Sequence, residues 1–194
     1  NDISLNPSDS DGDGFSSCDA DCNDFDDSIA PDLFDDECDG VDQNCNGIAD
    51  DGFLDQYEPN ETWTPLDTNA VNYLGQLDTD DDLIEITNYH GHALDVDKFV
   101  FYNDDGFWTT FHFIIDVWDV PSTLDLALDL EWYDENGVSQ GSVASATSNG
   151  QGTDLQIDYG GSSGTDDTGY YVLTVTGIGA DCNTPYQIRF EEVF

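Results

Sequence analysis

The charge of this chain constrains its folding more than any other feature of the sequence. Among its 194 residues, 44 are Asp or Glu and only Lys98 and Arg189 oppose them, so the formal net charge is −42. Like charge of this size opposes compaction unless salt screens it or bound cations neutralise it. It also repels nucleic-acid phosphates and anionic membrane surfaces. We therefore predict bound divalent cations, no nucleic-acid partner and no membrane insertion.

The second part of the chain predicts packed β-structure. Apolar residues make up 38% of the sequence and aromatic residues 12%, which favours a core over disorder. From Trp63 onward, short runs alternate between apolar and polar residues, and turn sequences rich in Asn, Asp and Gly separate them. The runs are 98–102, 110–115, 124–130, 170–175 and 186–194. We predict an all-β fold, an antiparallel β-sandwich of about seven to nine strands over residues 57–194.

Residues 1–56, here named the acidic segment, show no helical or strand periodicity and predict a loop-rich unit stabilised by disulfides and calcium. Carboxylates take positions one, three and five of a first loop: Asp9, Asp11 and Asp13. Gly14 takes position six, where the chain turns sharply, and Phe15 offers its carbonyl at position seven. Ala20 stands where an EF-hand has its twelfth-position acid, so Asp19 or Asp21 must complete the shell.

A second loop repeats this arrangement. Side chains with oxygen ligands take its positions one, three and five: Asp42, Asn44 and Asn46. Gly47 takes position six, and Ile48 offers a carbonyl. Asp50 stands at position nine, and Asp51 or an acid from elsewhere would close the site. Because glycine recurs at the turn position, a merely solvated acidic face is the weaker explanation. All-oxygen ligands favour calcium over zinc or copper, and an open loop favours calcium over magnesium, which demands a stricter octahedron.

Further carboxylates lie between the two loops. They are Asp21, Asp24, Asp26, Asp27, Glu37 and Asp39. These side chains would be able to form a third site or to share a cation with the first loop. We expect two bound calcium ions, with three as the alternative.

The five cysteines predict disulfides rather than a zinc site, because hard acids surround them. They are Cys18, Cys22, Cys38, Cys45 and Cys182. We expect a bridge from Cys38 to Cys45, which would close the segment that presents the second loop. Cys182 would tether the acidic segment through Cys18 or Cys22, and one thiol would stay free or bond to another chain. This cysteine usage indicates a secreted protein, extracellular or at the cell surface.

Three other sequence features bear on function. Asn60-Glu61-Thr62 is the clean glycosylation sequon of the chain, so Asn60 is the candidate for a glycan. His90-Gly91-His92 resembles a fragment of a metal site, but we expect surface or packing histidines there. The chain contains no Met and begins at Asn1, as expected of a mature chain after removal of a signal peptide.

The sequence offers no catalytic motif. No serine nucleophile elbow between a strand and a helix, no HExxH helix and no glycine-rich phosphate loop is indicated, and abundant carboxylates make any single pair uninformative. No run approaches the roughly 20 apolar residues that a membrane-spanning helix needs. We therefore predict that the chain is not an enzyme.

The acidic segment resembles a known family. Residues 9–14, 21–24, 31 and 37–50 are similar to one repeat of the MopE-type metal-binding motif of bacterial secreted proteins. That family name is associated with copper, but this chain has no Met, and its three histidines lie outside the repeat. The resemblance therefore implies calcium rather than copper.

The remainder resembles a second family. Residues 57–62, 95–101, 125–137, 169–175 and 185–188 look like a bacterial pre-peptidase C-terminal domain spanning roughly residues 57–194. This resemblance implies a β-sandwich that accompanies secreted proteins, often hydrolases, and has no catalytic residues of its own.

These observations leave two functions open. The first is a structural subunit of an extracellular fibre or cell-surface assembly, a homo-oligomer or polymer built through strand or sandwich contacts. Residues 3–5 would be the donor strand that adds to a neighbouring copy. The alternative is a carbohydrate-binding or targeting module that accompanies a secreted hydrolase and binds a glycan through an exposed Trp.

Overall fold

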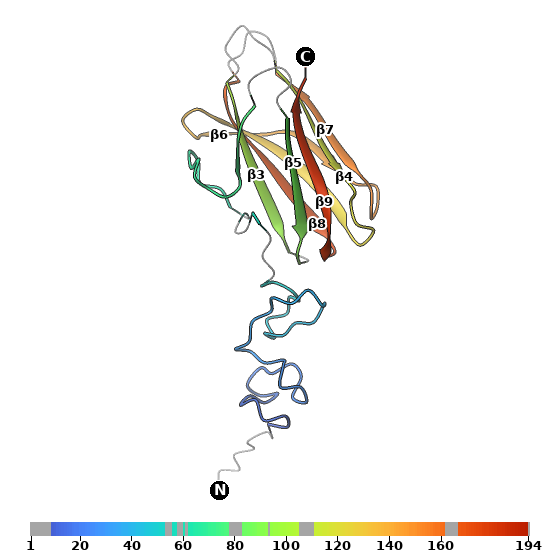
Figure 1. Cartoon of the computed structure of the whole chain (residues 1–194). Helices are drawn as coiled ribbons and strands as arrows, with labels where there is room; N and C mark the ends of the chain where they lie inside the picture. The colour runs from blue at the N-terminus through green and yellow to red at the C-terminus, as the bar shows by residue number, and fades with distance from the viewer. Residues whose placement is uncertain are drawn as a thin grey trace. The chain divides into compact units, whose positions relative to one another are not determined.

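The chain forms two compact units, residues Asn1–Phe53 and Leu54–Phe194. The computed structural model describes residues 9–52, 56–57, 60, 62–77, 83–92, 94–104, 111–161 and 167–193. Figure 1 shows loops in the acidic segment and strands in the second unit. Each unit is described by itself below.

The second unit is a sandwich of two β-sheets. Its strands are β1 (Tyr73–Gln76), β2 (Leu83–His90), β3 (Val96–Asn103), β4 (His112–Trp118), β5 (Asp125–Asp134), β6 (Ser139–Thr147), β7 (Leu155–Gly160), β8 (Gly169–Ile178) and β9 (Asp181–Glu192). One sheet has the order β1-β3-β8-β5-β6 and the other has the order β2-β9-β4-β7. The predicted all-β sandwich is confirmed, and the nine strands among the described residues lie within the predicted number.

Alternation between the two faces of each strand builds the core between the sheets. In β4, Phe113, Ile115 and Val117 are buried while their neighbours are partly exposed. In β5, Leu126 and Leu128 lie in the same core at 1% and 2% exposure. Side chains in a strand point alternately to opposite faces, so this sequence pattern dictates both the strands and their buried face.

One strand departs from the predicted antiparallel arrangement. β1 pairs with β3 in parallel, with Tyr73 opposite Val100. The strand between them in sequence, β2, belongs to the other sheet, where it pairs with β9. The chain crosses to the second sheet and returns, so β1 and β3 run in the same direction.

Aromatic rings fill the centre of the sandwich. Phe101 is fully buried, and its ring centroid lies 5.1 Å from that of Phe113 and 5.5 Å from those of Tyr171 and Phe190. These four residues come from β3, β4, β8 and β9, so the cluster joins both sheets. Burial of several large rings at one place is a major source of stability for the sandwich.

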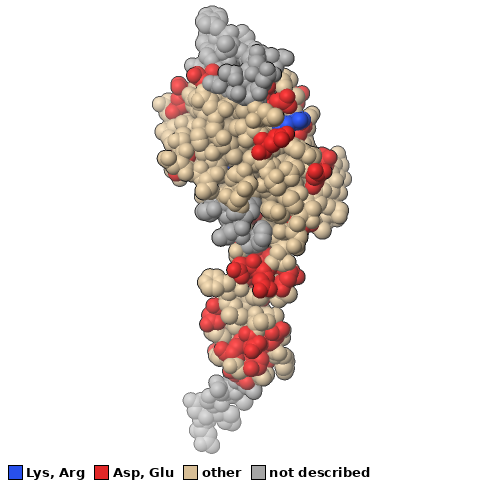
Figure 2. Space-filling model, in the orientation of Figure 1, with Lys and Arg blue, Asp and Glu red and all other residues tan. Residues whose placement is uncertain are grey.

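The described part of the acidic segment, residues 9–52, contains neither helix nor strand. Ala30 is the one hydrophobic side chain buried there, whereas Phe25 and Phe34 are 83% and 88% exposed. The other buried residues of residues 9–52 are polar: Ser16, Asp21, Asp35 and Asp50. Figure 2 shows acidic side chains gathered over the surface of this segment. Its fold therefore depends on polar interactions and cross-links rather than on an apolar core.

The disulfides differ from the predicted pairing. Cys22 is bonded to Cys45 across a separation of 23 residues, and their Cα atoms are 5.6 Å apart. Cys38 and Cys182 are also disulfide-bonded, and Cys18 is a free, exposed thiol. The expected bridge from Cys38 to Cys45 is therefore wrong, as are those from Cys182 to Cys18 or Cys22. Disulfides indicate an oxidising, extracellular environment.

The backbone explains the pairing that forms. The N–H of Ala30 donates to the carbonyl of Gln43 at 2.8 Å, so the chain after Cys22 returns beside the chain that leads to Cys45. The N–H of Cys22 also points to Sγ of Cys45. Sequence spacing alone could not reveal this long-range backbone contact.

Replacing Cys22 and Cys45 together by Ser is expected to destabilise the acidic segment by about 3 kcal/mol, because the bridge removes the loop-closure entropy of the unfolded chain. Hydrogen exchange of residues 9–52 in urea with saturating calcium would measure this loss. Cys18→Ser is the matched control, because its thiol is free and exposed, and it should change stability by less than about 0.5 kcal/mol. Equal effects of the two changes would contradict a structural role for the bridge.

No helix in the described part of the chain is long and apolar enough to cross a membrane.

Candidate metal centres

The first loop brings together the three carboxylates expected at positions one, three and five. Asp9, Asp11 and Asp13 each offer an oxygen, and these oxygens lie within 4.8 Å of one another. Gly14 has φ +104°, a left-handed conformation that a side chain would disfavour, and it turns the backbone around this group. The Oδ2 atoms of Asp11 and Asp13 are buried without a hydrogen-bond partner in the described structure. Such oxygens are suited to a cation.

Backbone hydrogen bonds hold the first loop in shape. The carboxylate of Asp9 accepts from the N–H groups of Gly12 at 2.7 Å and Gly14 at 3.2 Å. Asp13 accepts from the N–H of Phe15 at 2.7 Å. The loop is thus organised by its own acids, which convert a run of Asp and Gly into a fixed turn.

The second loop has the same pattern of hydrogen bonds. Oδ2 of Asp42 accepts from the N–H of Gly47 at 2.7 Å, as Asp9 accepts from Gly14. Oδ1 of Asn44 accepts from the N–H of Asn46, and Oδ1 of Asn46 accepts from the N–H of Ile48. Gly47 also has a left-handed φ, at +95°. Positions one, three, five, six and seven therefore correspond in the two loops.

Asp51, rather than Asp50, faces the second loop. The two carboxylate oxygens of Asp51 accept from the side-chain amides of Asn44 at 3.0 Å and Asn46 at 2.6 Å. Asp50 is 5% exposed, and its carboxylate accepts from the backbone N–H groups of residues 39 and 40. Asp51 thus faces positions three and five of the second loop, while Asp50 organises the preceding turn.

Two of the acids between the loops lie in supporting positions. Asp24 accepts from both the N–H and the hydroxyl of Ser10, at 3.1 and 3.0 Å, so its carboxylate lies beside the first loop. Asp21 is 6% exposed, and its Oδ2 has no hydrogen-bond partner among the described atoms. Asp24 therefore lies beside the first loop, and Asp21 keeps one buried oxygen that is available to a ligand.

Three predicted ligands are instead occupied by close neighbours. Asp19 accepts from the hydroxyl of Ser16 at 2.6 Å. Asp26 accepts from the hydroxyl and N–H of Ser28, and these hydrogen bonds lower the pKa of its carboxyl. Asp39 accepts from the N–H of residue 41 and the side chain of residue 43. Each of these three carboxylates is thus bonded to residues within four positions along the chain, and the partner of Asp39 at residue 43 belongs to the second loop.

Sequence reasoning missed Asp35. This side chain is 1% exposed, and its Oδ2 accepts from the N–H of Asp50 at 3.0 Å. Burial raises the pKa of its carboxyl, and the charges of Asp50, Asp51 and Asp42 act in the same direction. No local pattern distinguishes Asp35 from the exposed acids around it, because its burial arises from the contact with residue 50.

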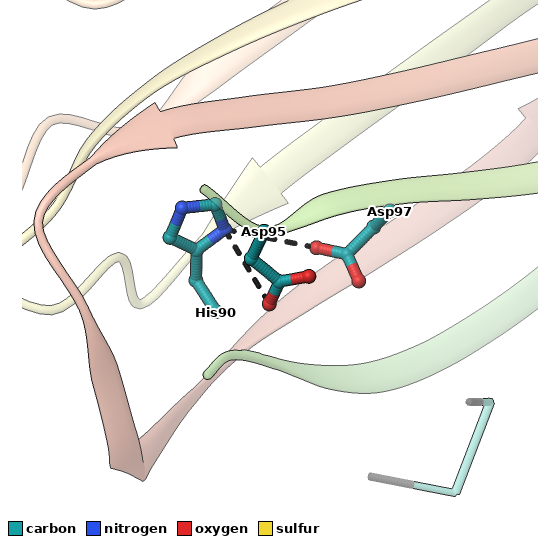
Figure 3. Close-up of side chains that lie close together, drawn as sticks. All are labelled: His90, Asp95 and Asp97. Carbon is teal, nitrogen blue, oxygen red and sulfur yellow. Dashed lines mark ion pairs between the residues drawn. The ribbon is translucent and has the colours of Figure 1, made fainter. Parts of the chain in front are cut away.

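A third group lies within the sandwich and contains the buried cluster His90, Asp95 and Asp97. Figure 3 shows the imidazole facing both carboxylates at the end of β2 and the start of β3. His90 and Asp97 are fully buried and Asp95 is 5% exposed. Nδ1 of His90 lies 3.8 Å from Oδ2 of each aspartate. His90 is therefore not a surface residue, and of the two expected roles only that of a packing residue agrees with its full burial.

The sequence did contain a signal for this cluster. The buried side chains of β2 alternate through Ile86, Asn88 and His90, so the strand register turns His90 inward. Asp95 and Asp97 share the same alternate spacing. An inward histidine followed by two inward acids could have been recognised as a buried polar site.

Polar groups from distant parts of the chain surround the carboxylate of Asp97. Its Oδ2 accepts from the hydroxyl of Tyr186 at 2.9 Å, and its Oδ1 accepts from the side-chain amide of Asn60 at 3.0 Å. The amide of Asn88 donates in turn to the Tyr186 hydroxyl. Burial, followed by the charge of Asp97, raises the pKa of Tyr186 well above its usual value, so this hydroxyl stays a donor.

Asn60 is the predicted glycosylation residue, and this prediction is wrong for the folded chain. Its side chain is fully buried, and its amide nitrogen is bonded to Asp97. A glycan attached to that nitrogen would have to replace the hydrogen bond and occupy the interior of the sandwich.

Asp95 should make the stability of the metal-free sandwich pH-dependent. Its pKa is raised to about 6, first by burial and then by the charge of Asp97, whereas the unfolded value is near 3.8. The folded state therefore binds more protons between these values, and stability falls as pH rises from about 4 to 6, by on the order of 2 kcal/mol. Unfolding of chelated protein followed by Trp fluorescence would measure this slope. Asp95→Asn, which is neutral at every pH, should flatten the dependence of stability on pH. An unchanged slope in that variant would show that another group causes the dependence.

Comparisons with known proteins add a structural likeness. No family model matches the chain, and no curated protein matches it. The pre-peptidase C-terminal domain of a collagenase from Bacillus anthracis matches with TM-score 0.31 and 13% identity, covering 61% of this chain and 92% of that one. A protein from Sulfurospirillum deleyianum matches with TM-score 0.35 and 11% identity, covering 57% of this chain and 96% of that one. The resemblance of the acidic segment to a MopE-type repeat stays a likeness of sequence. Over about three fifths of its length, the chain is similar in structure to the pre-peptidase C-terminal domain of that collagenase.

Proposed function

We propose that this chain is a non-enzymatic, secreted calcium-binding structural protein whose acidic segment binds at least two calcium ions. The observation that carries the proposal is the hydrogen-bond pattern shared by the first and second loops. In each loop the first carboxylate accepts from the glycine N–H at position six, and the fifth side chain accepts from the N–H at position seven. The remaining oxygens of such a turn can surround a hard cation.

The charge of the acidic segment supports the same conclusion. Residues 9–52 contain fifteen Asp and one Glu but no Lys or Arg. Several of these acids are buried or gathered within one loop, although the segment has no apolar core to compensate for their repulsion. Bound divalent cations would neutralise the acids and connect distant parts of the loops at the same time.

Calorimetric titration of the chelated protein with calcium tests this proposal. We expect two or more ions per chain, with Asp9→Ala and Asp42→Ala each removing one of them. Asp32→Ala is the matched control, because this exposed acid of the same segment lies outside both loops. Absence of calcium binding would contradict the proposal. An equal loss of bound calcium in Asp32→Ala would show that calcium is attracted to the acidic surface in general rather than bound at specific sites.

Assembly into a fibre or surface layer is the second part of the proposal, and it rests on a sheet edge. β6 is an edge strand, and its sequence, Ser139–Thr147, contains no charged residue in a chain of net charge −42. Edge strands offer unpaired backbone groups to a second chain, and charged side chains usually protect them. The predicted donor strand at residues 3–5 lies outside the described residues.

Light scattering and electron microscopy at saturating calcium test the assembly. We expect growth of particles that Ser145→Asp suppresses, because it adds charge to the exposed β6 edge, while Ser122→Asp in an exposed turn does not. Deleting residues 1–8 would test the donor strand separately. A monodisperse wild-type monomer at high protein and calcium concentration would refute the polymer.

A cavity on the second sheet favours glycan binding as the alternative function. It has a volume of about 410 Å³ and is lined by Asp116, Val117, Trp118, Asp154, Leu155, Gln156 and Arg189. The guanidinium of Arg189 lies 5.8 Å from the ring of Trp118, beside the carboxylate of Asp116. An aromatic ring with fixed polar groups is a common design for sugar recognition. Binding to a glycan array that Trp118→Ala abolishes and His112→Ala preserves would support glycan binding. The absence of binding to any glycan on the array would contradict it.

A further inference from the structure

The imidazole of His90 is buried without a hydrogen bond. Neither Nδ1 nor Nε2 has a hydrogen-bond partner within the described structure, although the ring is fully buried. The separations of 3.8 Å from Nδ1 to the carboxylates of Asp95 and Asp97 exceed the roughly 3.2 Å limit of a good hydrogen bond. Buried polar groups nearly always have hydrogen-bond partners, so the two unpartnered nitrogens of His90 require an explanation.

The spacing of the three side chains suits a shared ion. One ligand atom from each of His90, Asp95 and Asp97 lies within 4.8 Å of the others. Ligand atoms held at about 2.0–2.2 Å from one metal ion are roughly 3 to 4 Å apart, close to the observed 3.8 Å. These separations are too long for hydrogen bonds, but they suit three ligand atoms that coordinate one ion.

Donors from the surrounding structure orient the carboxylates toward the imidazole. The N–H of Gly91 donates to Oδ2 of Asp95 at 2.7 Å, and the hydroxyl of Tyr186 donates to Oδ2 of Asp97 at 2.9 Å. These are the same two oxygens that face Nδ1 of His90. Hydrogen bonds that fix metal-binding side chains in this way are a regular part of metal sites.

The basic residues of the chain do not compensate the buried charge. Lys98 and Arg189 are its only Lys and Arg residues. The ammonium of Lys98 donates to the hydroxyl of Thr174, and Arg189 is paired with Asp116. Protonation of His90 would balance only one of the two buried carboxylates, and His92, whose charge also acts on Asp95, is partly exposed to solvent. A divalent cation within the cluster would balance both carboxylates.

We propose that His90, Asp95 and Asp97 form a buried site for one divalent transition-metal ion, with zinc as the representative ion. An imidazole nitrogen combined with two carboxylates is a ligand set typical of zinc and its first-row neighbours. Calcium instead prefers six to eight oxygen ligands, which the loops of the acidic segment are able to supply. The chain would therefore bind two classes of cation, each in its own unit.

The test uses the full chain, with its disulfides intact, refolded from denaturant after chelation. Refolding in calcium with and without zinc lets the ion enter a site that is closed in the folded state. Metal analysis after gel filtration should give one zinc per chain at saturating calcium, together with a higher midpoint of thermal unfolding by Trp fluorescence. Absence of zinc, or of any thermal shift, would overturn the site.

Variants separate this site from general acidity. His90→Gln and Asp95→Asn should each lose the bound zinc, while His112→Gln, which alters a partly exposed His–Asp pair, should keep it. Tyr186→Phe should weaken binding by about 10- to 100-fold, because it removes the hydroxyl that orients Asp97. Asp95→Asn should fold at least as well as the metal-free wild type, since it removes a buried charge without changing the side-chain volume. Zinc retained by His90→Gln would place the ion elsewhere and reject the proposal.

Discussion

Removing calcium is expected to unfold residues 9–52 and to leave the sandwich folded. Ala30 is the one buried hydrophobic side chain in that part of the structure, and sixteen acids without a basic residue repel one another once the cations leave. Hydrogen exchange should therefore rise to nearly unprotected rates throughout residues 9–52 after chelation. All four Trp residues belong to the second unit, so their fluorescence should report an unchanged sandwich.

High salt provides the control for this experiment. At about 1 M sodium chloride the Debye length is roughly 3 Å, so repulsion between the acids is largely screened. Sodium would not, however, hold the loop oxygens in a defined coordination shell. Protection that calcium restores and sodium does not would assign the order of the segment to bound ions. Equal protection from exchange with and without chelator would mean that the disulfides and turns alone keep residues 9–52 folded. That result would contradict the expected role of calcium in stabilising the segment.

Phe101→Ala should destabilise the sandwich by about 3–5 kcal/mol, because the substitution opens a cavity where both sheets meet. Phe101 is fully buried and touches the rings of Phe113, Tyr171 and Phe190 at centroid distances of 5.1 to 5.5 Å. Urea unfolding at saturating calcium, followed by Trp fluorescence, would measure the loss.

Leu94→Ala is the matched control for Phe101→Ala. Leu94 is 65% exposed, so its truncation should change the free energy of unfolding by less than about 0.5 kcal/mol. A loss below 1 kcal/mol for Phe101→Ala would show that the aromatic cluster does not connect the sheets as described.

The strands were predictable because their signal is local. The run Leu124–Leu130 alternates between leucine and short or charged residues, and β5 buries Leu126, Leu128 and Leu130. The alternation states which face is buried before any partner strand is known. The parallel pairing of β1 with β3 was not predictable from the four residues of β1, since the path of the chain through the other sheet determines its direction.

The two loops of the acidic segment were also predictable from local sequence. Asp9 and Asp42 bond to glycine N–H groups five residues later, within one turn of chain. By contrast, the choice between Asp50 and Asp51 at the second loop depended on the contact of Asp50 with residues 39 and 40. Such contacts depend on the folded path, which the ligand spacing does not specify.

By itself, the sequence determined the large negative charge, which follows from composition. It also determined the buried strand faces and the Asp-Gly turns, because these depend on neighbours a few positions apart. Only the tertiary structure decided the pairing of Cys22 with Cys45 and the burial of His90 against Asp95 and Asp97. Asn60 and Tyr186 reach Asp97 across separations of 37 and 89 residues. Long-range packing brought these groups together, and a polar group that is exposed and solvated in the unfolded chain acquires a new chemistry only when folding removes its water.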